Sequence, residues 1–267
     1  MKPVEFINLG SGSRGNCTWL EYGDTCLLVD GGFSCKQLQQ RIEAAGKDPE
    51  RVSGILISHS HTDHICGVSR FCQLYKVPVY SNRLTQRDLC AVLQQGPQPK
   101  QIPEFKIFTT GDTFKIGDIE VNTFQVPHDT SDPVGFSFQV GAVRLGHVTD
   151  LGKVTSLVRE RLKGVYGLLF EANHDITLLR ESTRSWALKQ RIMSSSGHLS
   201  NEDSARLLDE IVSTGLKELV LGHLSQDCNR PEIALNQVNQ ALGGKDVSIR
   251  VSSQESITRI LPEGFSA

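Results

Sequence analysis

The chain has 267 residues, 38% of them hydrophobic, which is enough for one large domain with a full core over residues 1–267. Its formal net charge of −2 argues against a uniformly basic nucleic-acid binder, although a local basic rim around an acidic cleft would leave the same total. Seven cysteines without a Cys-x-x-Cys pair, no signal-peptide pattern in the first thirty residues and no apolar run of membrane-spanning length argue against a disulfide scaffold and a membrane protein, and they favour a cytoplasmic location.

The first third of the chain alternates short apolar runs with helical patterns. The runs predict strands at Val4–Leu9, Cys26–Asp30, Ile55–Ser58 and Val77–Tyr80. The patterns between them predict helices at Lys36–Ala45, Ile65–Leu74 and Leu84–Leu93. The segment that follows is rich in Gln and Pro, and we interpret it as a surface connection, Gln94–Pro103.

The middle of the chain, Phe105–His147, is mostly strand and turn. The last third returns to alternation, with strands at Gly167–Phe170 and Leu219–Leu221 and a helix at Asn201–Val212 that opens with a Ser200 cap. Two strand-rich halves with helices at intervals predict an α/β protein, in which two sheets pack face to face and helices cover the outside.

Three of the eight histidines fall within six positions, in His59-Ser-His61-Thr-Asp63-His64, directly after an apolar run. In an extended chain, residues two apart project the same way, so His59 and His61 can hold one ion together. Asp63 and His64 lie where the chain turns into the next helix, and they are placed to hold a second ion. The alternative is a capped helix start with incidental surface imidazoles, which this density of ligand types disfavours.

This segment resembles the His-x-His-x-Asp-His signature of the metallo-β-lactamase-fold hydrolases, and further matches follow predicted strands at His128, Asp150 and His223. The resemblance implies a four-layered αββα sandwich, the metallo-β-lactamase fold, and two divalent ions, Zn or Mn. The implied ligands are His59, His61 and His128 for one ion, Asp63, His64 and His223 for the other, and Asp150 as the bridge. Asp30 matches the family's supporting aspartate, which steadies the ligand loop. Such an ion pair would lower the pKa of a bridging water and lead to hydrolysis.

Two other segments resemble those of the tRNA 3′-end endonucleases of this superfamily. Phe170-Glu171-Ala172 is similar to their His-Glu-Ala segment, and Gly197-His198-Leu-Ser to their Gly-His-Ser-Thr segment. A departing phosphodiester oxygen needs a proton, and a histidine held by a carboxylate can supply it at neutral pH. The resemblance implies His198 as the acid and Glu171 as its orienter, and Asp63 completes the predicted catalytic residues. The alternative is a helix-capping histidine and a strand-end glutamate bonded to backbone.

Nearly the whole chain resembles the WalJ (YycJ) group of small metallo-β-lactamase-fold proteins. The matching segments are Leu9–Asn16, His59–His64, His128–Gly135, Thr149–Gly152, Glu171–Asp175 and Gly197–Asn201. This group is associated with 5′-to-3′ exonuclease action on duplex DNA, so the resemblance implies a phosphodiester hydrolase with DNA as its partner. The alternatives are a small-molecule (cyclic) phosphodiesterase, a thioesterase or lactonase on the same fold, and a metal-binding regulatory module without catalysis.

Two further segments each have two interpretations, and three single residues are considered after them. The Gly10–Asn16 loop could offer backbone amides to a phosphate, or it could be only a hairpin turn. The basic segment Arg180–Arg191, with Trp186 inside it, is a candidate rim for DNA, or a solvated helix face with its aromatic tucked inward. His174 and Asp132 are candidates for the cleft, and His147 is expected to be a satisfied residue within a strand.

Overall fold

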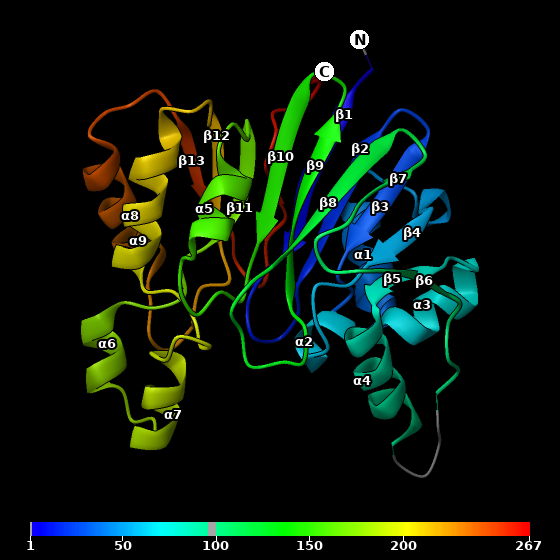
Figure 1. The fold of residues 1–267 in the computed structure, drawn as a ribbon, viewed down its shortest axis with the longest axis horizontal. Helices are drawn as coiled ribbons and strands as arrows, with labels where there is room; N and C mark the ends of the chain where they lie inside the picture. Colours follow the sequence, from blue (N-terminus) through cyan, green and yellow to red (C-terminus); the bar gives the residue numbers. More distant parts are fainter. Residues whose placement is uncertain (1, 96–99) are drawn as a thin grey trace.

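The structure is a computed structural model that describes residues 2–95 and 100–267, and its two β-sheets pack face to face between helices (Figure 1). The first sheet contains β1 (Val4–Gly10), β2 (Cys17–Tyr22), β3 (Thr25–Val29), β4 (Gly54–Leu56), β5 (Val79–Asn82), β6 (Phe105–Phe108) and β14 (Thr258–Arg259). The second sheet contains β7 (Thr113–Ile116), β8 (Ile119–Gln125), β9 (Val134–Val140), β10 (Val143–Val148), β11 (Gly167–Glu171), β12 (Glu218–Gly222) and β13 (Ser248–Val251).

The strand orders are β14-β1-β2-β3-β4-β5-β6 and β13-β12-β11-β10-β9-β8-β7. Strands β3 to β6 run parallel in the first sheet, and β10 to β13 run parallel in the second. The carboxyl ends of parallel strands meet at one edge of their sheet, and this edge is where α/β proteins place their ligands.

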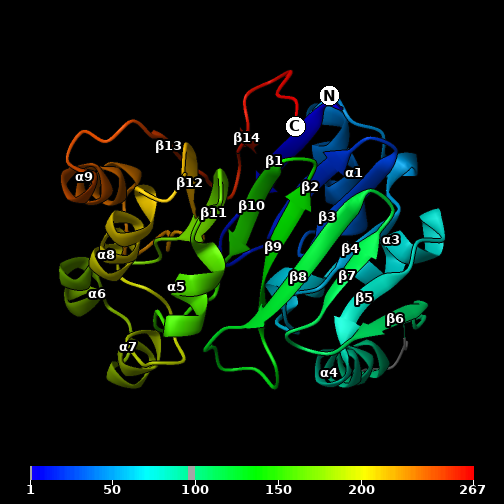
Figure 2. The same cartoon turned by 45° about the horizontal axis from the view of Figure 1, so that its top comes forward.

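Helices lie on the outer face of each sheet (Figure 2). Those on the first sheet are α1 (Cys35–Ala44), α3 (Val68–Tyr75) and α4 (Arg83–Gln94), with the short α2 (Thr62–Ile65) at its edge. Those on the second sheet are α5 (Ser156–Leu162), α8 (Asn201–Val212) and α9 (Pro231–Leu242). The remaining pair, α6 (Ile176–Glu181) and α7 (Trp186–Ile192), projects beyond the sheets.

Three buried hydrophobic clusters hold the four layers together. One joins α1, α3 and α4 to the first sheet, a second fills the space between the sheets, and a third joins α5, α8 and α9 to the second sheet. In strand β11, successive side chains point to opposite faces of the sheet and so belong to different clusters. Leu168 and Phe170 face the helices, whereas Leu169 faces the other sheet. The predicted αββα sandwich is confirmed.

Three predicted elements differ from those observed by more than one residue at an end. The predicted helix Ile65–Leu74 is interrupted, because the Gly67 amide donates to the Gly31 carbonyl at 2.9 Å instead of continuing α2. A Cβ at Gly67 would lie 2.2 Å from the Phe33 carbonyl oxygen, so the chain can pass this point only as glycine. The strand predicted at Val77–Tyr80 begins and ends two residues later, as β5.

The predicted strand Ile55–Ser58 is observed as β4, which ends at Leu56. Residues 96–99 of the predicted connection Gln94–Pro103 lie outside the described residues. Within residues 2–95 and 100–267, no helix combines the length and the apolarity that crossing a membrane requires.

Candidate metal centre and catalytic site

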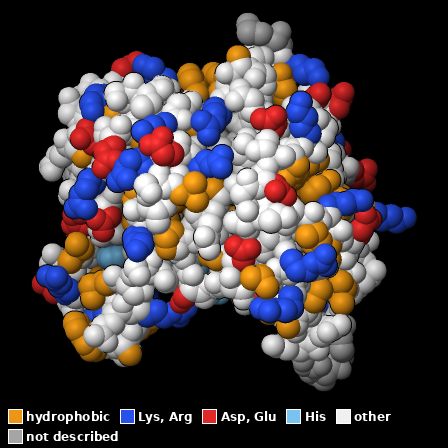
Figure 3. All heavy atoms as spheres, in the orientation of Figure 1, with side chains coloured by type: hydrophobic (Ala, Val, Ile, Leu, Met, Phe, Trp, Pro, Cys, Tyr) orange, Lys and Arg blue, Asp and Glu red, His pale blue; other side chains and the backbone are white. Residues whose placement is uncertain are grey.

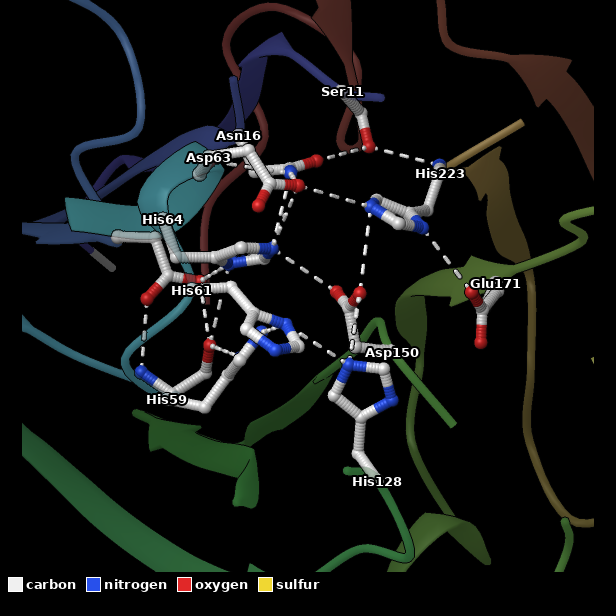
Figure 4. Close-up of polar contacts among 12 residues, drawn as sticks. Ser11, Asn16, His59, His61, Asp63, His64, His128, Asp150, Glu171 and His223 are labelled. Atoms are coloured by element: carbon white, nitrogen blue, oxygen red, sulfur yellow. Dashed lines mark hydrogen bonds and ion pairs between the residues drawn. The ribbon is translucent and has the colours of Figure 1, made fainter. Parts of the chain in front are cut away.

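The predicted ligands come from loops that follow strand ends, and the fold brings them to one place (Figure 4). The motif His59–His64 follows β4, and His128 lies beyond the end of β8. Asp150 lies just beyond β10, and His223 directly follows β12. All seven predicted ligands therefore converge where the two sheets present the ends of their central strands.

The backbone at the site is held in an uncommon conformation. Four non-glycine residues in the described part of the chain have positive φ, and three of them are Asp30 at 62°, Asp150 at 58° and His223 at 55°. The left-handed conformation costs an L-residue roughly 1–2 kcal/mol. Such strain is typical of functional sites, where the surrounding structure fixes the direction of a side chain.

One group of nitrogens comes from His59, His61 and His128. The Nδ1 of His61 lies 3.2 Å from the Nε2 of His59 and 3.2 Å from the Nε2 of His128. Imidazole nitrogens bound to one tetrahedral zinc at its usual bond length are about 3.3 Å apart. The spacing of these three nitrogens therefore suits a shared ion.

A second group comes from Asp63, His64 and His223. The Oδ2 of Asp63 lies 3.6 Å from the Nε2 of each histidine. Asp150 stands between the two groups, because one of its oxygens lies 3.1 Å from the Nε2 of His64 and the other lies 3.6 Å from the Nε2 of His128. Its carboxylate can therefore contact ions at both groups.

Two atoms at the centre of the cluster make no hydrogen bond in the part of the chain that the structure describes. They are Oδ2 of Asp150 and Nε2 of His223, and both are buried. A buried polar atom without a partner costs roughly 1–3 kcal/mol. Histidine nitrogens and carboxylate oxygens are ligands for divalent metals, so the donor set fits a metal centre.

The pKa values of the clustered histidines also fit a metal centre. Burial and the neighbouring His64 lower the pKa of His59 well below its usual range, which favours the neutral, metal-binding imidazole. Burial also acts to lower the pKa of His223, but Asp150, Asp63 and Glu171 outweigh it and raise that pKa to about 10. The carboxylates therefore attract positive charge to this place, and a bound cation can replace the protons.

Each of four histidines is fixed by a contact at its other ring nitrogen. These contacts pair Nδ1 of His64 with Asp30 at 2.8 Å, of His59 with Ser58 at 3.0 Å, of His128 with the Gly197 carbonyl at 3.0 Å and of His223 with Glu171 at 3.2 Å. Such contacts set the tautomer and turn the free nitrogen toward the ion. Asp30 lies where the resemblance implied, behind the ligand loop, and it also accepts from the Ser58 amide.

The predicted proton-donating pair lies beside the predicted metal ligands. The Nδ1 of His198 is 2.7 Å from Oε1 of Glu171 and 3.8 Å from Oδ1 of Asp150. Glu171 is fully buried, and its other oxygen accepts from the Leu151 amide at 2.6 Å. Burial acts to raise the pKa of Glu171, but His198 and His223 outweigh it and hold that pKa at about 2. Glu171 is therefore an ionised carboxylate shared by His198 and His223.

The Gly10–Asn16 loop closes over the second group of ligands. Oγ of Ser11 accepts from the His223 amide at 2.8 Å, and the Asn16 amide donates to the Asp63 carbonyl at 2.8 Å. Five backbone amides of this loop already donate to acceptors of the protein. They are those of Ser11, Gly12, Arg14, Gly15 and Asn16. The loop therefore supports the ligands, and the phosphate-cradle interpretation is wrong for these amides.

A cleft of about 380 Å³ opens in front of the cluster. Four of the predicted ligands and His198 line one part of it, and Arg184, Leu188, Arg191 and Ile192 line another part. These four residues belong to the α6–α7 arm, which we define as residues Ile176–Ile192. The outline of the molecule is indented between α7 at lower left and α4 at lower right (Figure 3).

Comparison with known proteins identifies the family. Residues 25–224 match the family model described as the beta-lactamase superfamily domain. The chain belongs to this superfamily. Exodeoxyribonuclease YycJ of Bacillus anthracis is 35% identical over 246 residues, which are 92% of each chain. Exodeoxyribonuclease WalJ of Streptococcus pneumoniae is 36% identical over 247 residues, which are 91% of each chain. The resemblances to the metallo-β-lactamase-fold hydrolases and to the WalJ (YycJ) group are confirmed.

Solved structures of the superfamily share the fold. The metallo-β-lactamase fold protein YhfI of Bacillus subtilis matches with a TM-score of 0.74 at 15% identity, covering 97% of this chain and 100% of its own. The short form of human tRNase Z matches with a TM-score of 0.65 at 15% identity, covering 98% and 100%. At this identity the likeness concerns the fold alone.

Several other expectations for this superfamily member are resolved by the structure. Trp186 is 63% exposed, so the expectation of an inward-facing aromatic is wrong. Of the described residues that line the cleft, none is His174 or Asp132. The Asp132 carboxylate instead accepts a hydrogen bond from the Thr110 hydroxyl at 2.7 Å. His147 is buried in β10 and bonded to Thr18 at 3.2 Å, as predicted.

Proposed function

We propose that this chain is a dinuclear-metal-dependent phosphodiester hydrolase that acts on DNA as a 5′-to-3′ exonuclease. Two relatives named exodeoxyribonucleases align with more than nine-tenths of the chain and support the substrate. The observation that carries the proposal is the 2.7 Å contact between His198 and Glu171, beside the convergent ligands and facing the cleft. A phosphodiester needs such a proton donor for its leaving oxygen.

The proposed ions are Zn or Mn. His59, His61 and His128 would hold one ion, Asp63, His64 and His223 the other, and Asp150 both, in keeping with their spacing. When bound, two such ions activate a water and stabilise the charge that develops on the attacked phosphate.

The chain's own residues supply the remaining chemistry. Glu171 accepts at Nδ1 of His198 and so directs Nε2 of that ring toward the leaving oxygen, to which His198 gives its proton. Asp63 lines the cleft with its side chain 23% exposed, so its carboxylate can accept a hydrogen bond from the attacking water. DNA as the substrate and seven free cysteines support a cytoplasmic protein, and we treat residues 1–267 as one domain.

The proposal is tested with end-labelled duplex DNA, single strands, RNA and a chromogenic phosphodiester, each with Zn and with Mn. We expect metal-dependent shortening of DNA from the 5′ end, suppressed by salt because backbone contacts release counterions. Product sizes separate the alternatives. Rapid cleavage of closed circular DNA would exclude an exonuclease, and thioester or lactone hydrolysis without DNA cleavage would favour the other hydrolases of this fold.

A further inference from the structure

The part of the cleft that is lined by the α6–α7 arm is basic. Arg184 and Arg191 line it together with the apolar side chains of Leu188 and Ile192. Leu188, Arg191 and Ile192 have helical spacing, so one face of α7 is turned toward the cleft. Neither arginine contacts one of the seven predicted ligands directly, so the metal centre does not account for them.

Arg191 is linked to the first group of histidines through the carboxylate of Asp129. Its Nε lies 2.5 Å from Oδ2 of Asp129, whose other oxygen lies 3.4 Å from the Nε2 of His128 and 3.6 Å from the Nε2 of His61. The two terminal amino groups of Arg191 make no hydrogen bond to any residue in the described ranges, and the side chain is 61% exposed. Asp129 therefore orients the guanidinium and leaves both terminal amino groups, with four N–H donors, for a ligand.

Arg184 is also incompletely paired. One terminal amino group lies 2.9 Å from Oδ2 of the exposed Asp227, whereas its Nε is buried and bonds nothing in the described part of the chain. A guanidinium has five N–H donors in a planar fork that matches phosphate oxygens. Arg184 lines the cleft, so an anion there can accept from the terminal N–H groups that Asp227 does not occupy.

The arm that carries both arginines is anchored to the rest of the molecule. Nζ of the buried Lys189 donates to the carbonyls of Arg180 and Ser182 at 2.6 Å each, which joins α7 to the end of α6. Ile192 packs with Leu179 of α6 and with Cys228 outside the arm. The two guanidiniums are therefore presented by a fixed wall at a set place relative to the metal centre.

We propose that Arg184 and Arg191 bind the 5′-terminal phosphate of the DNA strand that is cut. This inference rests on the proposed function and adds the feature of the substrate that is recognised. The two arginines line the same cleft of about 380 Å³ as His198 and several predicted metal ligands, so a strand end bound there can contact both. A terminal monoester carries about −1.5 to −2 charges at neutral pH and three acceptor oxygens, so two arginines favour it over an internal diester.

The test compares duplexes that differ only in a 5′-phosphate or a 5′-hydroxyl group. Wild type should act faster on the phosphorylated end, and each of Arg184→Gln and Arg191→Gln should reduce that preference in kcat/KM by about 10- to 100-fold, the worth of a charged hydrogen bond. Cleavage of the 5′-hydroxyl end and of the chromogenic diester should stay near wild type. Arg206→Gln, which removes an exposed arginine of α8 outside the cleft, is the matched control and should keep the preference.

Binding of 5′-phosphorylated, phosphorothioate-linked duplexes, measured by fluorescence anisotropy, provides the second readout. The same duplexes with a 5′-hydroxyl group are the comparison. If the Arg184→Gln and Arg191→Gln variants bind only the phosphorylated duplex more weakly than wild type does, the inference is supported. Equal weakening for both ends would assign the arginines to the internal backbone and overturn it, as would a wild type indifferent to the 5′-phosphate. These results leave the proposed function standing, whereas loss of all DNA cleavage by wild type with every metal would remove the proposed function itself.

Discussion

Glu171 joins two parts of the site that the sequence presents separately. Its Oε1 contacts Nδ1 of His198 at 2.7 Å and Nδ1 of His223 at 3.2 Å. The sequence pattern linked Glu171 only to His198, because nothing in the chain order shows that a glutamate 52 residues before His223 lies behind its ring. One buried carboxylate therefore orients both the proposed proton donor and a proposed metal ligand.

We predict that His198→Ala keeps the metals and substrate binding but loses roughly 10²- to 10⁴-fold in rate on DNA, the usual worth of a positioned proton donor. The comparison substrate is an aryl phosphodiester, whose leaving group departs as a stable anion and needs little protonation. On that substrate the variant should be nearly as fast as wild type, as steady-state rates will show.

Glu171→Gln serves as the contrasting variant, because loss of its charge should slow DNA cleavage and also weaken metal binding through His223. Equal slowing of both substrates by His198→Ala, or loss of a metal from it, would make His198 a ligand or a structural residue.

The ligands could be predicted from sequence, whereas their supports could not. Four ligand-type residues within six positions indicated His59–His64. Positions after apolar runs, together with the family resemblance, indicated His128, Asp150 and His223. The contact of Ser11 with the His223 amide joins residues 212 apart in the chain, and that of the Asn16 amide with the Asp63 carbonyl joins residues 47 apart. Serine and asparagine in a glycine-rich loop give no signal of such contacts, because the loop alone looks like a turn.

At the scale of elements, predictions failed where tertiary contacts override the local pattern. The apolar spacing of Ile65–Leu74 is helical throughout, but Gly67 bonds Gly31 and the helix breaks. Ser81 and Asn82 look like turn residues, yet both are buried in β5, where Asn82 also caps α4. The strand ends that position the site were predicted within a few residues, because their apolar runs are unambiguous.

The position of α2 depends on how closely Gly32 approaches it. A Cβ at Gly32 would lie 1.6 Å from the Asp63 carbonyl oxygen and 2.6 Å from the Asn16 amide. We predict that Gly32→Ala destabilises the fold by roughly 3 kcal/mol or more and displaces Asp63, so that metal affinity falls as well. Denaturant unfolding and competition with a chelator measure the two effects.

Gly46→Ala is the matched control, because its added Cβ meets nothing within 4 Å but its φ is +74°. It should cost only roughly 1–2 kcal/mol and leave metal affinity unchanged. A Gly32→Ala protein with wild-type metal affinity would show that α2 is not positioned by this contact.

At the scale of the whole molecule, His147 links the two sheets. It lies in β10 and contacts Thr18 of β2 at 3.2 Å, and burial lowers its pKa to about 4. Because the unfolded pKa is about 6.5, the unfolded chain binds a proton first as the pH falls. The stability linked to His147 is therefore complete above about pH 6.5 and lost progressively toward pH 4, by up to about 3 kcal/mol.

His147→Gln removes this titration and can keep a hydrogen bond to Thr18. Between pH 7 and pH 4.5, with chelator present in both samples, we predict that the free energy of unfolding falls less steeply in the variant than in wild type. Parallel stability curves would mean that the pKa of His147 is the same in the folded and the unfolded protein.

The two-ion centre is the claim on which every residue assignment depends, and the metal content of wild type and of Asp150→Ala tests it most directly. The Asp150 carboxylate faces both groups of ligands, with oxygens 3.1 Å from His64 and 3.6 Å from His128. We predict close to two divalent ions per chain in fully loaded wild type and weakened binding of both in Asp150→Ala. A single ion in loaded wild type, or two ions held tightly by the variant, would contradict the account.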